Sequence, residues 1–321
     1  MTKFNELSAD EQMKSLTTVA QRILGHYELN IIDLTVINHG FNTTFSIHTP
    51  DQRFALRLNV NSRREVANVK AEIEWMSHLS DRGVVSLPRV VPTSQGETYV
   101  VDEGIERGRA IVAVLFTWLD GTIVAQLDDA TDALRAAGAA MARLHLDAAN
   151  FEMPAGARLP RRDDMWWGFP NVLTGSTGVL ASGDHELVER CHAVIQSTVA
   201  DLYRSEPIHI IHADLHGGNL MWNNGELSLF DFDDCAIGTP TQDLAASLFY
   251  LRDPAHRVTL MQGYRTVAEL PFGSERELST LVLQRQLILL NYFAGTENPE
   301  HRGIFEGFLQ HTRTAMEDFL P

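Results

Sequence analysis

Residues 211–219 read IHADLHGGN, and after a short interval residues 227–234 read LSLFDFDD. Asp214 precedes Asn219 by five positions, and Asp231 follows Asn219 by twelve. The glycine pair at 217–218 lets the first segment bend, and the apolar residues before Asp231 are typical of a short strand. An acid and an amide on one tight loop, facing a second acid across a hairpin, can converge on one metal ion.

This spacing has a chemical interpretation. Phosphoryl transfer needs a carboxylate that accepts the proton of the attacking hydroxyl, and oxygen ligands for Mg²⁺ at the β- and γ-phosphates. Asp214 and Asn219 have the spacing of the kinase loop H-R-D-x-x-x-x-N. Asp231, at the end of the next short apolar strand, has the position of the metal-binding aspartate in the kinase D-F-G motif. Single His-x-Asp pairs arise by chance, but the ordered set is much less expected by chance. The pattern predicts a phosphotransferase, with His212 as scaffold.

The bulk properties restrict the partners. The 321 residues carry a net charge of -16, which argues against binding to nucleic acid or to an anionic membrane. The two cysteines form no disulfide framework, and no cysteine–histidine group has zinc-ligand spacing. The N-terminus lacks the apolar core of a signal peptide, so we expect a cytoplasmic protein. The oligomeric state stays open.

The first third of the chain has the pattern of a small antiparallel sheet with one inserted helix. Ser8 and Glu11 form a capping-box pattern that opens a helix to about His26. Turn signals at residues 38–40 and 49–52 separate strand-like runs. The predicted elements that follow are strands at Ile31–Ile37, Thr43–His48 and Arg53–Leu58, a helix at Arg64–Asp81, and strands around Val90, around Tyr99 and at Ala110–Phe116.

Beyond Gly121 the pattern becomes mainly helical. Helices are predicted at Ala130–Leu146, at Asp184–Ser205 and over most of the chain from Gln242, with short strands at Ile208–Ile211 and Leu227–Phe230. We therefore expect an α+β, bilobed, protein-kinase-like fold. A small N-terminal antiparallel-sheet lobe that binds nucleotide covers residues 1–118, and a larger, mainly helical catalytic and acceptor-binding lobe covers residues 119–321.

The segments HADLHGGNLMW and LFDFDD resemble the aminoglycoside phosphotransferase and choline kinase superfamily of kinase-like phosphotransferases. The acids at 231–234, followed by Gly238 and Asp243, are most similar to the branch of type II homoserine kinases and the bacterial stress-response kinase. The resemblance implies that Asp214 is the catalytic base and that Asn219 and Asp231 are metal ligands. It makes Asp233 a second ligand or a substrate-facing acid, and implies that Asp243 braces the loop.

The same resemblance implies that ATP and Mg²⁺ are the cofactors and that the N-terminal lobe holds the nucleotide. Backbone N–H groups of the turn Asn38–Thr44 (Gly40, Asn42 and Thr43) would face phosphate. Arg57 takes the place of the usual strand lysine and keeps its charge, though not its shape. Its expected partner is Glu72, with Glu74 as the alternative. The hinge Leu115–Trp118, which includes Phe116, would hold adenine through its backbone.

The acceptor is the least determined part. Trp166 and Trp167, together with Asp234, would line the acceptor site, and the acids would favour an amino-bearing compound. A small-molecule acceptor is expected: an amino sugar, an amino alcohol or a homoserine-like compound. Two alternatives remain: a protein Ser/Thr kinase of the stress-response type, and a catalytically silent nucleotide-binding regulator suggested by Arg57. ATP against GTP, and one metal ion against two, also stay open.

Overall fold

In the computed structural model, helix α1 (Ala9–Leu24) begins where the capping-box pattern predicts. The Ser8 hydroxyl accepts a hydrogen bond from the Glu11 backbone N–H, and the Glu11 carboxylate accepts one from the Ser8 N–H at 2.9 Å. The structure describes residues 4, 7–60, 64–102, 110–174, 178–296 and 299–320. These residues form two units. The first consists of residues 1–121, 152–158 and 228–233, and the second contains the rest of the chain.

The first unit is built on a five-stranded antiparallel sheet. The strands are β1 (Asp33–His39), β2 (Thr43–His48), β3 (Arg53–Leu58), β4 (Val100–Asp102) and β5 (Ile111–Thr117), in the order β1-β2-β3-β5-β4. Five of the six predicted strands are therefore present: β2 and β3 have the predicted bounds, and the ends of the other three are shifted by one or two residues. Val90 forms only an isolated bridge to Phe116, so the prediction of a strand there was wrong. The prolines at 88 and 92 explain this, because neither can donate to a ladder.

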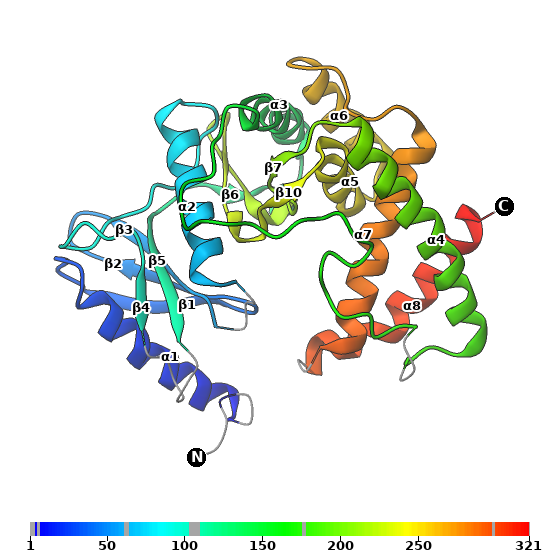
Figure 1. Cartoon of the computed structure of the whole chain (residues 1–321). Coiled ribbons are helices and arrows are strands. Elements are labelled where there is room, and N and C mark those ends of the chain that lie inside the picture. The colour runs from blue at the N-terminus through cyan, green and yellow to red at the C-terminus, as the bar shows by residue number, and fades with distance from the viewer. Residues whose placement is uncertain are drawn as a thin grey trace. The chain divides into compact units, whose positions relative to one another are not determined.

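Two helices pack against opposite faces of this sheet (Figure 1). Apolar residues of α1 share a core with Leu56 and Leu58 of β3. Arg57 lies between these two leucines, so its side chain points to the other face, where helix α2 (Val66–Asp81) supplies Glu72. The alternation along β3 thus explains why one strand serves both an apolar core and a buried ion pair.

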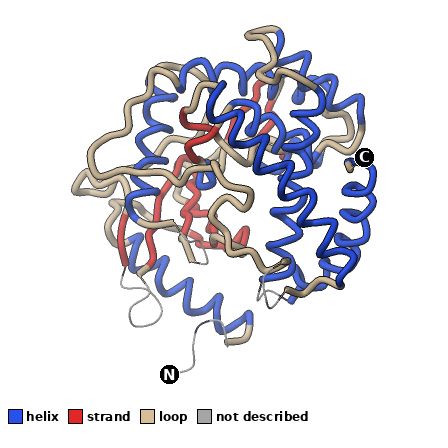
Figure 2. The backbone as a smooth tube through the Cα atoms, turned by 45° about the vertical axis from the view of Figure 1, so that its right-hand side comes forward, coloured by secondary structure: helices blue, strands red, loops and turns tan. Residues whose placement is uncertain are grey.

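The second unit is mainly helical, and Figure 2 shows its helices in blue. Its helices are α3 (Thr131–Ala148), α4 (Ser182–Ser205), α5 (Pro240–Tyr250), α6 (Pro254–Arg265), α7 (Glu275–Gly295) and α8 (Pro299–Phe319). Its short strands include β6 (Thr122–Ile123), β7 (His209–Ile211), β8 (Leu220–Asn223) and β10 (Ala236–Gly238); β9 (Glu226–Leu229) runs into the first unit. The predicted α+β class, with a small antiparallel sheet and a larger helical part, is confirmed.

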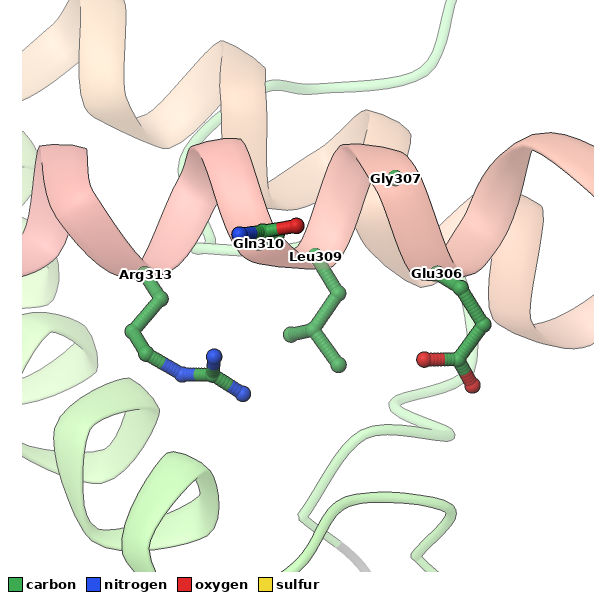
Figure 3. Close-up of a pocket in the computed structure, with 5 residues that line it drawn as sticks. All are labelled: Glu306, Gly307, Leu309, Gln310 and Arg313. Carbon is green, nitrogen blue, oxygen red and sulfur yellow. The ribbon is translucent and has the colours of Figure 1, made fainter.

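Helices α4, α7 and α8 form one side of the second unit. Arg313 of α8 makes a bidentate ion pair with Asp184 of α4, with N–O distances of 2.6 and 2.8 Å. Arg313 also lines a hollow along α8 together with Glu306, Gly307, Leu309 and Gln310 (Figure 3). The Arg313 guanidinium is already paired with Asp184, so we assign no ligand to this hollow. Among the described helices, none is both long and apolar enough to cross a membrane.

The α3–α6 packing depends on two glycines. A Cβ atom at Gly263 would lie 1.9 Å from the Arg135 carbonyl oxygen, and one at Gly138 would lie 1.9 Å from the Leu260 carbonyl oxygen. The obstacle at both positions is backbone, so a rotamer change cannot relieve the clash. The two helices can approach this closely only because both positions lack a side chain.

We therefore expect Gly263→Ala to destabilise the protein by about 1–3 kcal/mol, the usual cost of overpacking. Chemical unfolding measures this change. The matched control is Gly303→Ala on α8, where no described heavy atom lies within 4 Å of the added Cβ. The control should be neutral or slightly stabilising, because alanine favours a helix over glycine. Equal losses in both variants would contradict the close-approach explanation.

Candidate active site

The loop that carries Asp214 follows strand β7, which pairs antiparallel with β10. Asp243 of α5 is fully buried and accepts hydrogen bonds from the backbone N–H groups of His212 and Ala213, at 3.1 and 2.7 Å. His145 lies 3.0 Å from the same carboxylate. Ala213 has φ +66°, a costly conformation for alanine. The expectation that Asp243 braces the loop is confirmed.

Asp243 remains charged in this buried position. Its burial by itself raises the pKa of the carboxyl, but the hydrogen bond and charge of His145, aided by His212 and the Ala213 N–H, lower the pKa below its ordinary value. A buried carboxylate that accepts several N–H groups is strongly held in one orientation. The backbone just before Asp214 is therefore anchored to α5.

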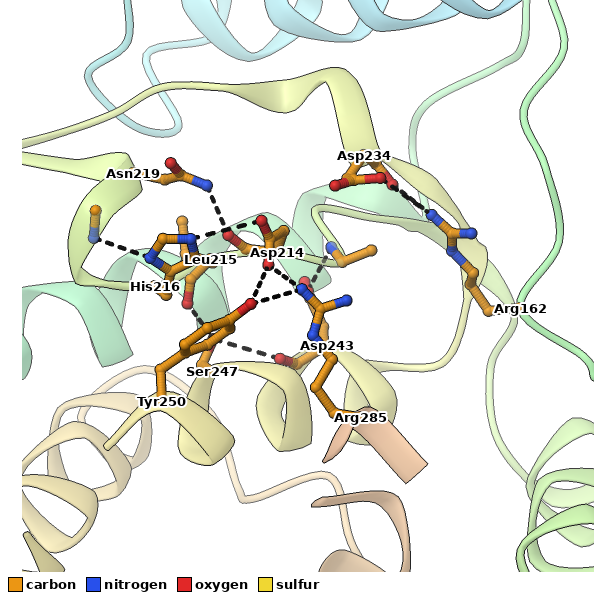
Figure 4. Close-up of polar contacts among 12 residues, drawn as sticks. Arg162, Asp214, Leu215, His216, Asn219, Asp234, Asp243, Ser247, Tyr250 and Arg285 are labelled. Atoms are coloured by element: carbon orange, nitrogen blue, oxygen red, sulfur yellow. Dashed lines mark hydrogen bonds and ion pairs between the residues drawn. The ribbon is translucent and has the colours of Figure 1, made fainter. Parts of the chain in front are cut away.

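Side chains from two helices and the loop itself surround the Asp214 carboxylate (Figure 4). Its Oδ1 atom accepts hydrogen bonds from Arg285 Nη2 of α7 and, at 3.3 Å, from the Tyr250 hydroxyl of α5. Its Oδ2 atom lies 3.5 Å from His216 Nε2. Burial alone raises the pKa of Asp214, but Arg285, with His216 and His212, brings it below the usual range. Asp214 is therefore an oriented, ionised carboxylate.

The short turn after Asp214 orients Asn219. The Asn219 side-chain amide donates through Nδ2 to the Asp214 backbone carbonyl at 2.9 Å. This bond leaves the Oδ1 atom without a hydrogen-bond partner among the described residues. His216 Nδ1 accepts the Gly218 N–H at 2.9 Å, so a neutral His216 carries its proton on Nε2, facing Asp214. The loop thus presents one carboxylate oxygen and one amide oxygen.

Gly218 has a steric role in this turn. A Cβ atom there would lie 2.6 Å from His216 Cε1. Gly218→Ala should displace the His216 ring and the loop, and we expect kcat to fall by up to about 100-fold, the cost of a misplacement of about 1 Å. Steady-state kinetics of the folded variant measures it. Gly183→Ala on α4 has open space around its Cβ and should keep normal kinetics; wild-type rates in Gly218→Ala would refute the role.

In the first unit, Arg57 and Glu72 form a bidentate buried pair, with N–O distances of 2.7 and 2.6 Å. Glu74 is exposed, so the predicted choice of Glu72 as the partner is confirmed. Burial alone lowers the pKa of Arg57, but Glu72, then Asp233 and Asp231, raise it well above its ordinary value. The guanidinium is permanently charged.

Two of the three acids of the LFDFDD segment, Asp231 and Asp233, interact electrostatically with Arg57. Asp231 has φ +62°, keeps 42% of its side chain exposed, and places Oδ1 3.9 Å from Arg57 Nη1. Asp233 Oδ2 accepts a hydrogen bond of 2.5 Å from Asn42 Nδ2. The turn between β1 and β2 is therefore connected to the acidic segment, which sequence analysis did not foresee.

The other residues predicted to bind nucleotide have defined partners. The Gly40 N–H donates to the Asn42 carbonyl at 2.9 Å. Thr43 is fully buried, with its hydroxyl 2.8 Å from His39 Nδ1. Phe116 is buried and Trp118 lies under the Arg53 guanidinium, 4.5 Å from the ring centre. Their predicted contacts with phosphate and adenine stay predictions.

The predicted acceptor residues belong to the second unit. Trp166 is buried and stacks on His192 of α4, with ring centres 6.0 Å apart. Trp167 is also buried and adopts φ +55°. Asp234 lies 3.6 Å from Arg162 Nη2, so a neighbouring cation offsets its charge. The structure therefore gives the Asp234 region less net negative charge than the sequence suggests.

Sequence reasoning missed Arg285, Tyr250 and Arg162. A signal for Arg285 existed, because residues 284–286 read QRQ within the apolar run LVLQRQLILLNYF. Polar side chains that interrupt a buried helical pattern need partners, and a buried charge needs an opposite one. The partner could not be named, since Asp214 is 71 positions away.

The chemistry of two donors, one from each unit, suits a divalent metal ion. Asn219 offers an amide oxygen, and Asp231 offers a partly exposed carboxylate; Mg²⁺ prefers such oxygen ligands, with water and phosphate completing the octahedron. In the described part of the chain, no group of three or more His, Cys, Asp or Glu side chains is clustered tightly enough to hold a metal. A Mg²⁺ ion that is bound with a nucleotide needs only a few protein ligands of this chemistry.

Residues 33–276 match the model of the phosphotransferase enzyme family, and the chain belongs to that family. The predicted resemblance is confirmed, and the chain is a phosphotransferase, or kinase. An uncharacterized Synechocystis sp. protein is 24% identical over 274 residues, 81% of this chain and 72% of the relative. Amicoumacin kinase of Bacillus subtilis is 22% identical over 210 residues, 65% of this chain and 60% of that kinase.

Solved structures show the same fold. A microcompartment-associated aminopropanol kinase superposes with a TM-score of 0.76 at 22% identity, over 94% of this chain and 95% of that one. Amicoumacin kinase hAmiN, in complex with AMP-PNP, Ca²⁺ and Ami, superposes with a TM-score of 0.78 at 18% identity, over 96% of both chains. The kinase-like fold predicted for this chain is confirmed.

Proposed function

We propose that the protein is an ATP- and Mg²⁺-dependent kinase that phosphorylates a hydroxyl group of a small molecule, with Asp214 as the base. The acceptor classes are amino sugars, amino alcohols and homoserine-like compounds. The observation that carries the proposal is the Asp214 loop, where Asp243 anchors the backbone and Arg285 fixes one carboxylate oxygen. A cytoplasmic location is part of the proposal.

Asp214 Oδ2 is the atom that we assign to proton transfer. Oδ1 is engaged by Arg285 and Tyr250, whereas the 3.5 Å separation from His216 is too long for a strong hydrogen bond to Oδ2. In this role the carboxylate orients the acceptor hydroxyl and takes up its proton as the oxygen attacks phosphorus. The low pKa of Asp214 keeps the carboxylate ionised before the acceptor binds.

Asn219 Oδ1 and Asp231 are the proposed Mg²⁺ ligands, with Asp233 as a further candidate. Mg²⁺ supplies charge neutralisation at the β- and γ-phosphates. The 2.5 Å bond from Asn42 uses one oxygen of Asp233, so Asp231 is the better candidate. The AMP-PNP and Ca²⁺ in the amicoumacin kinase complex support a nucleotide and a divalent cation here.

Arg57, held by Glu72, is the proposed partner of the ATP phosphates. Backbone groups of the turn at Gly40, Asn42 and Thr43 would assist it, and the hinge at Phe116 and Trp118 would hold adenine. The buried bidentate pair supports this assignment, because it fixes the position of a cation that burial alone would disfavour.

Acceptor profiling tests the proposed function. The purified protein is incubated with radiolabelled ATP and Mg²⁺ against a panel of amino sugars, amino alcohols and hydroxy amino acids. We expect phosphate transfer to at least one class, and loss of transfer when EDTA removes the metal ion. Absence of transfer to the whole panel, with label appearing on protein instead, would refute the small-molecule assignment.

A further inference from the structure

Arg285 has more hydrogen-bonding capacity than its observed partners use. The side chain is buried in α7, and only Nη2 is engaged: it donates to Asp214 Oδ1 and, at 2.8 Å, to the Tyr250 hydroxyl. Among the described residues, neither Nε nor Nη1 has a hydrogen-bond partner; Nε is buried, whereas Nη1 retains access to solvent. In Figure 4 the second terminal nitrogen of Arg285 points away from Asp214.

This end-on arrangement differs from two bidentate arginine pairs of the protein. Arg57 engages Glu72 through both terminal nitrogens, and Arg313 engages Asp184 through Nε and Nη2. Arginine–carboxylate pairs frequently form two parallel bonds. Arg285 instead supports the base with one nitrogen and leaves the other available on the same guanidinium.

The surroundings of Arg285 contain further donors. Two guanidinium groups contact the Trp167 ring: its centre is 5.3 Å from that of Arg285 and 4.7 Å from that of Arg162. Trp167 Nε1 is buried and has no hydrogen-bond partner in the described part of the chain. Asp234 faces Arg162, which offsets its charge. The two cations and two acids of this region balance in charge, but its N–H donors outnumber the acceptors that they contact, which suits a ligand with anionic oxygens.

We infer that Arg285 Nη1 binds a carboxylate of the acceptor, which makes the acceptor a short hydroxy acid, such as an amino acid with a β- or γ-hydroxyl. This inference rests on the proposed function and narrows it. Nη1 and Nη2 belong to one planar group, and Nη2 is the atom that contacts Asp214. A carboxylate bound at Nη1 therefore lies close to the base, and a hydroxyl only a few bonds from that carboxylate can approach Asp214. The alternative anion that could bind Arg285 Nη1 is the phosphoryl group that is being transferred.

Matched acceptor pairs that differ only by a carboxylate test the inference. The pairs are serine with ethanolamine, homoserine with 3-aminopropanol, and threonine with 1-amino-2-propanol. In at least one pair we expect kcat/KM to be about 10- to 100-fold higher for the carboxylate-bearing member, as one charge-assisted contact allows. Calorimetric binding without ATP should show the same order. Equal or better use of the amino alcohol in every pair overturns the inference, although the proposed function then stands.

Arg285→Lys separates the two anion sources. The lysine keeps a charge near Asp214 but has no second terminal nitrogen. If Arg285 binds the acceptor, the ratio of kcat/KM between the carboxylate-bearing member and the amino alcohol falls towards one. If Arg285 instead binds the phosphoryl group, kcat falls equally for both members and this ratio is unchanged. The second result overturns the inference. Arg313→Lys on α8 is the matched control and should keep the wild-type ratio. No transfer to any acceptor, by contrast, refutes the proposed function itself.

Discussion

Asp214→Asn should reduce phosphate transfer by about 10²- to 10⁴-fold, the usual contribution of a general base. The substitution keeps the shape of the side chain, and the amide oxygen can still accept from Arg285, so the buried guanidinium retains a partner. The capacity to take up a proton at Oδ2 is lost, together with the acceptor that faces His216 Nε2. Steady-state kinetics with the best acceptor measures the change.

Two measurements distinguish this effect from unfolding. Mg·ATP should still raise the melting temperature of Asp214→Asn, because its proposed binding residues Arg57 and Glu72 are unchanged. Asp163→Asn removes an exposed carboxylate of the same unit and should have wild-type kinetics. If Asp214→Asn keeps a rate near that of the wild type, the assignment of the base is wrong.

The parts of the fold and site that sequence predicted share a physical property: each is local. The capping box at Ser8, the Asp214–Asn219 turn and the β3 alternation around Arg57 are determined by residues a few positions apart. Even the choice of Glu72 over Glu74 depends on which face one helix presents. Local patterns of this kind survive in a single sequence.

The parts that could not be predicted depend on contacts between distant segments. Arg285 meets Asp214, and Asn42 meets Asp233, across 71 and 191 positions. The side-chain type shows that each needs a partner, but periodicity says nothing about which partner the fold supplies. The prediction of a strand around Val90 was wrong for a local reason. The prolines on either side limit the pairing of this segment to one bridge.

Glu72→Ala should destabilise the protein by about 3–5 kcal/mol, because it leaves the Arg57 guanidinium buried and without its main partner. The side chains of Arg57 and Glu72 are only 7% and 3% exposed, so solvent cannot replace the lost carboxylate. Urea unfolding measures the loss. The control is Glu74→Ala. Glu74 is exposed and lies two residues after Glu72 on α2, so its loss should change the free energy of unfolding by less than about 0.5 kcal/mol.

A double variant separates stability from nucleotide binding. Arg57→Met combined with Glu72→Met removes both charges, so it should be more stable than Glu72→Ala, since no unpaired charge remains buried. Its KM for ATP should nevertheless be higher than that of the wild type, because the cation proposed to bind the phosphates is gone. Recovery of stability without recovery of ATP use would show that the pair is kept for function. If the double variant uses ATP normally, Arg57 is a structural residue and the phosphate contact belongs to another group.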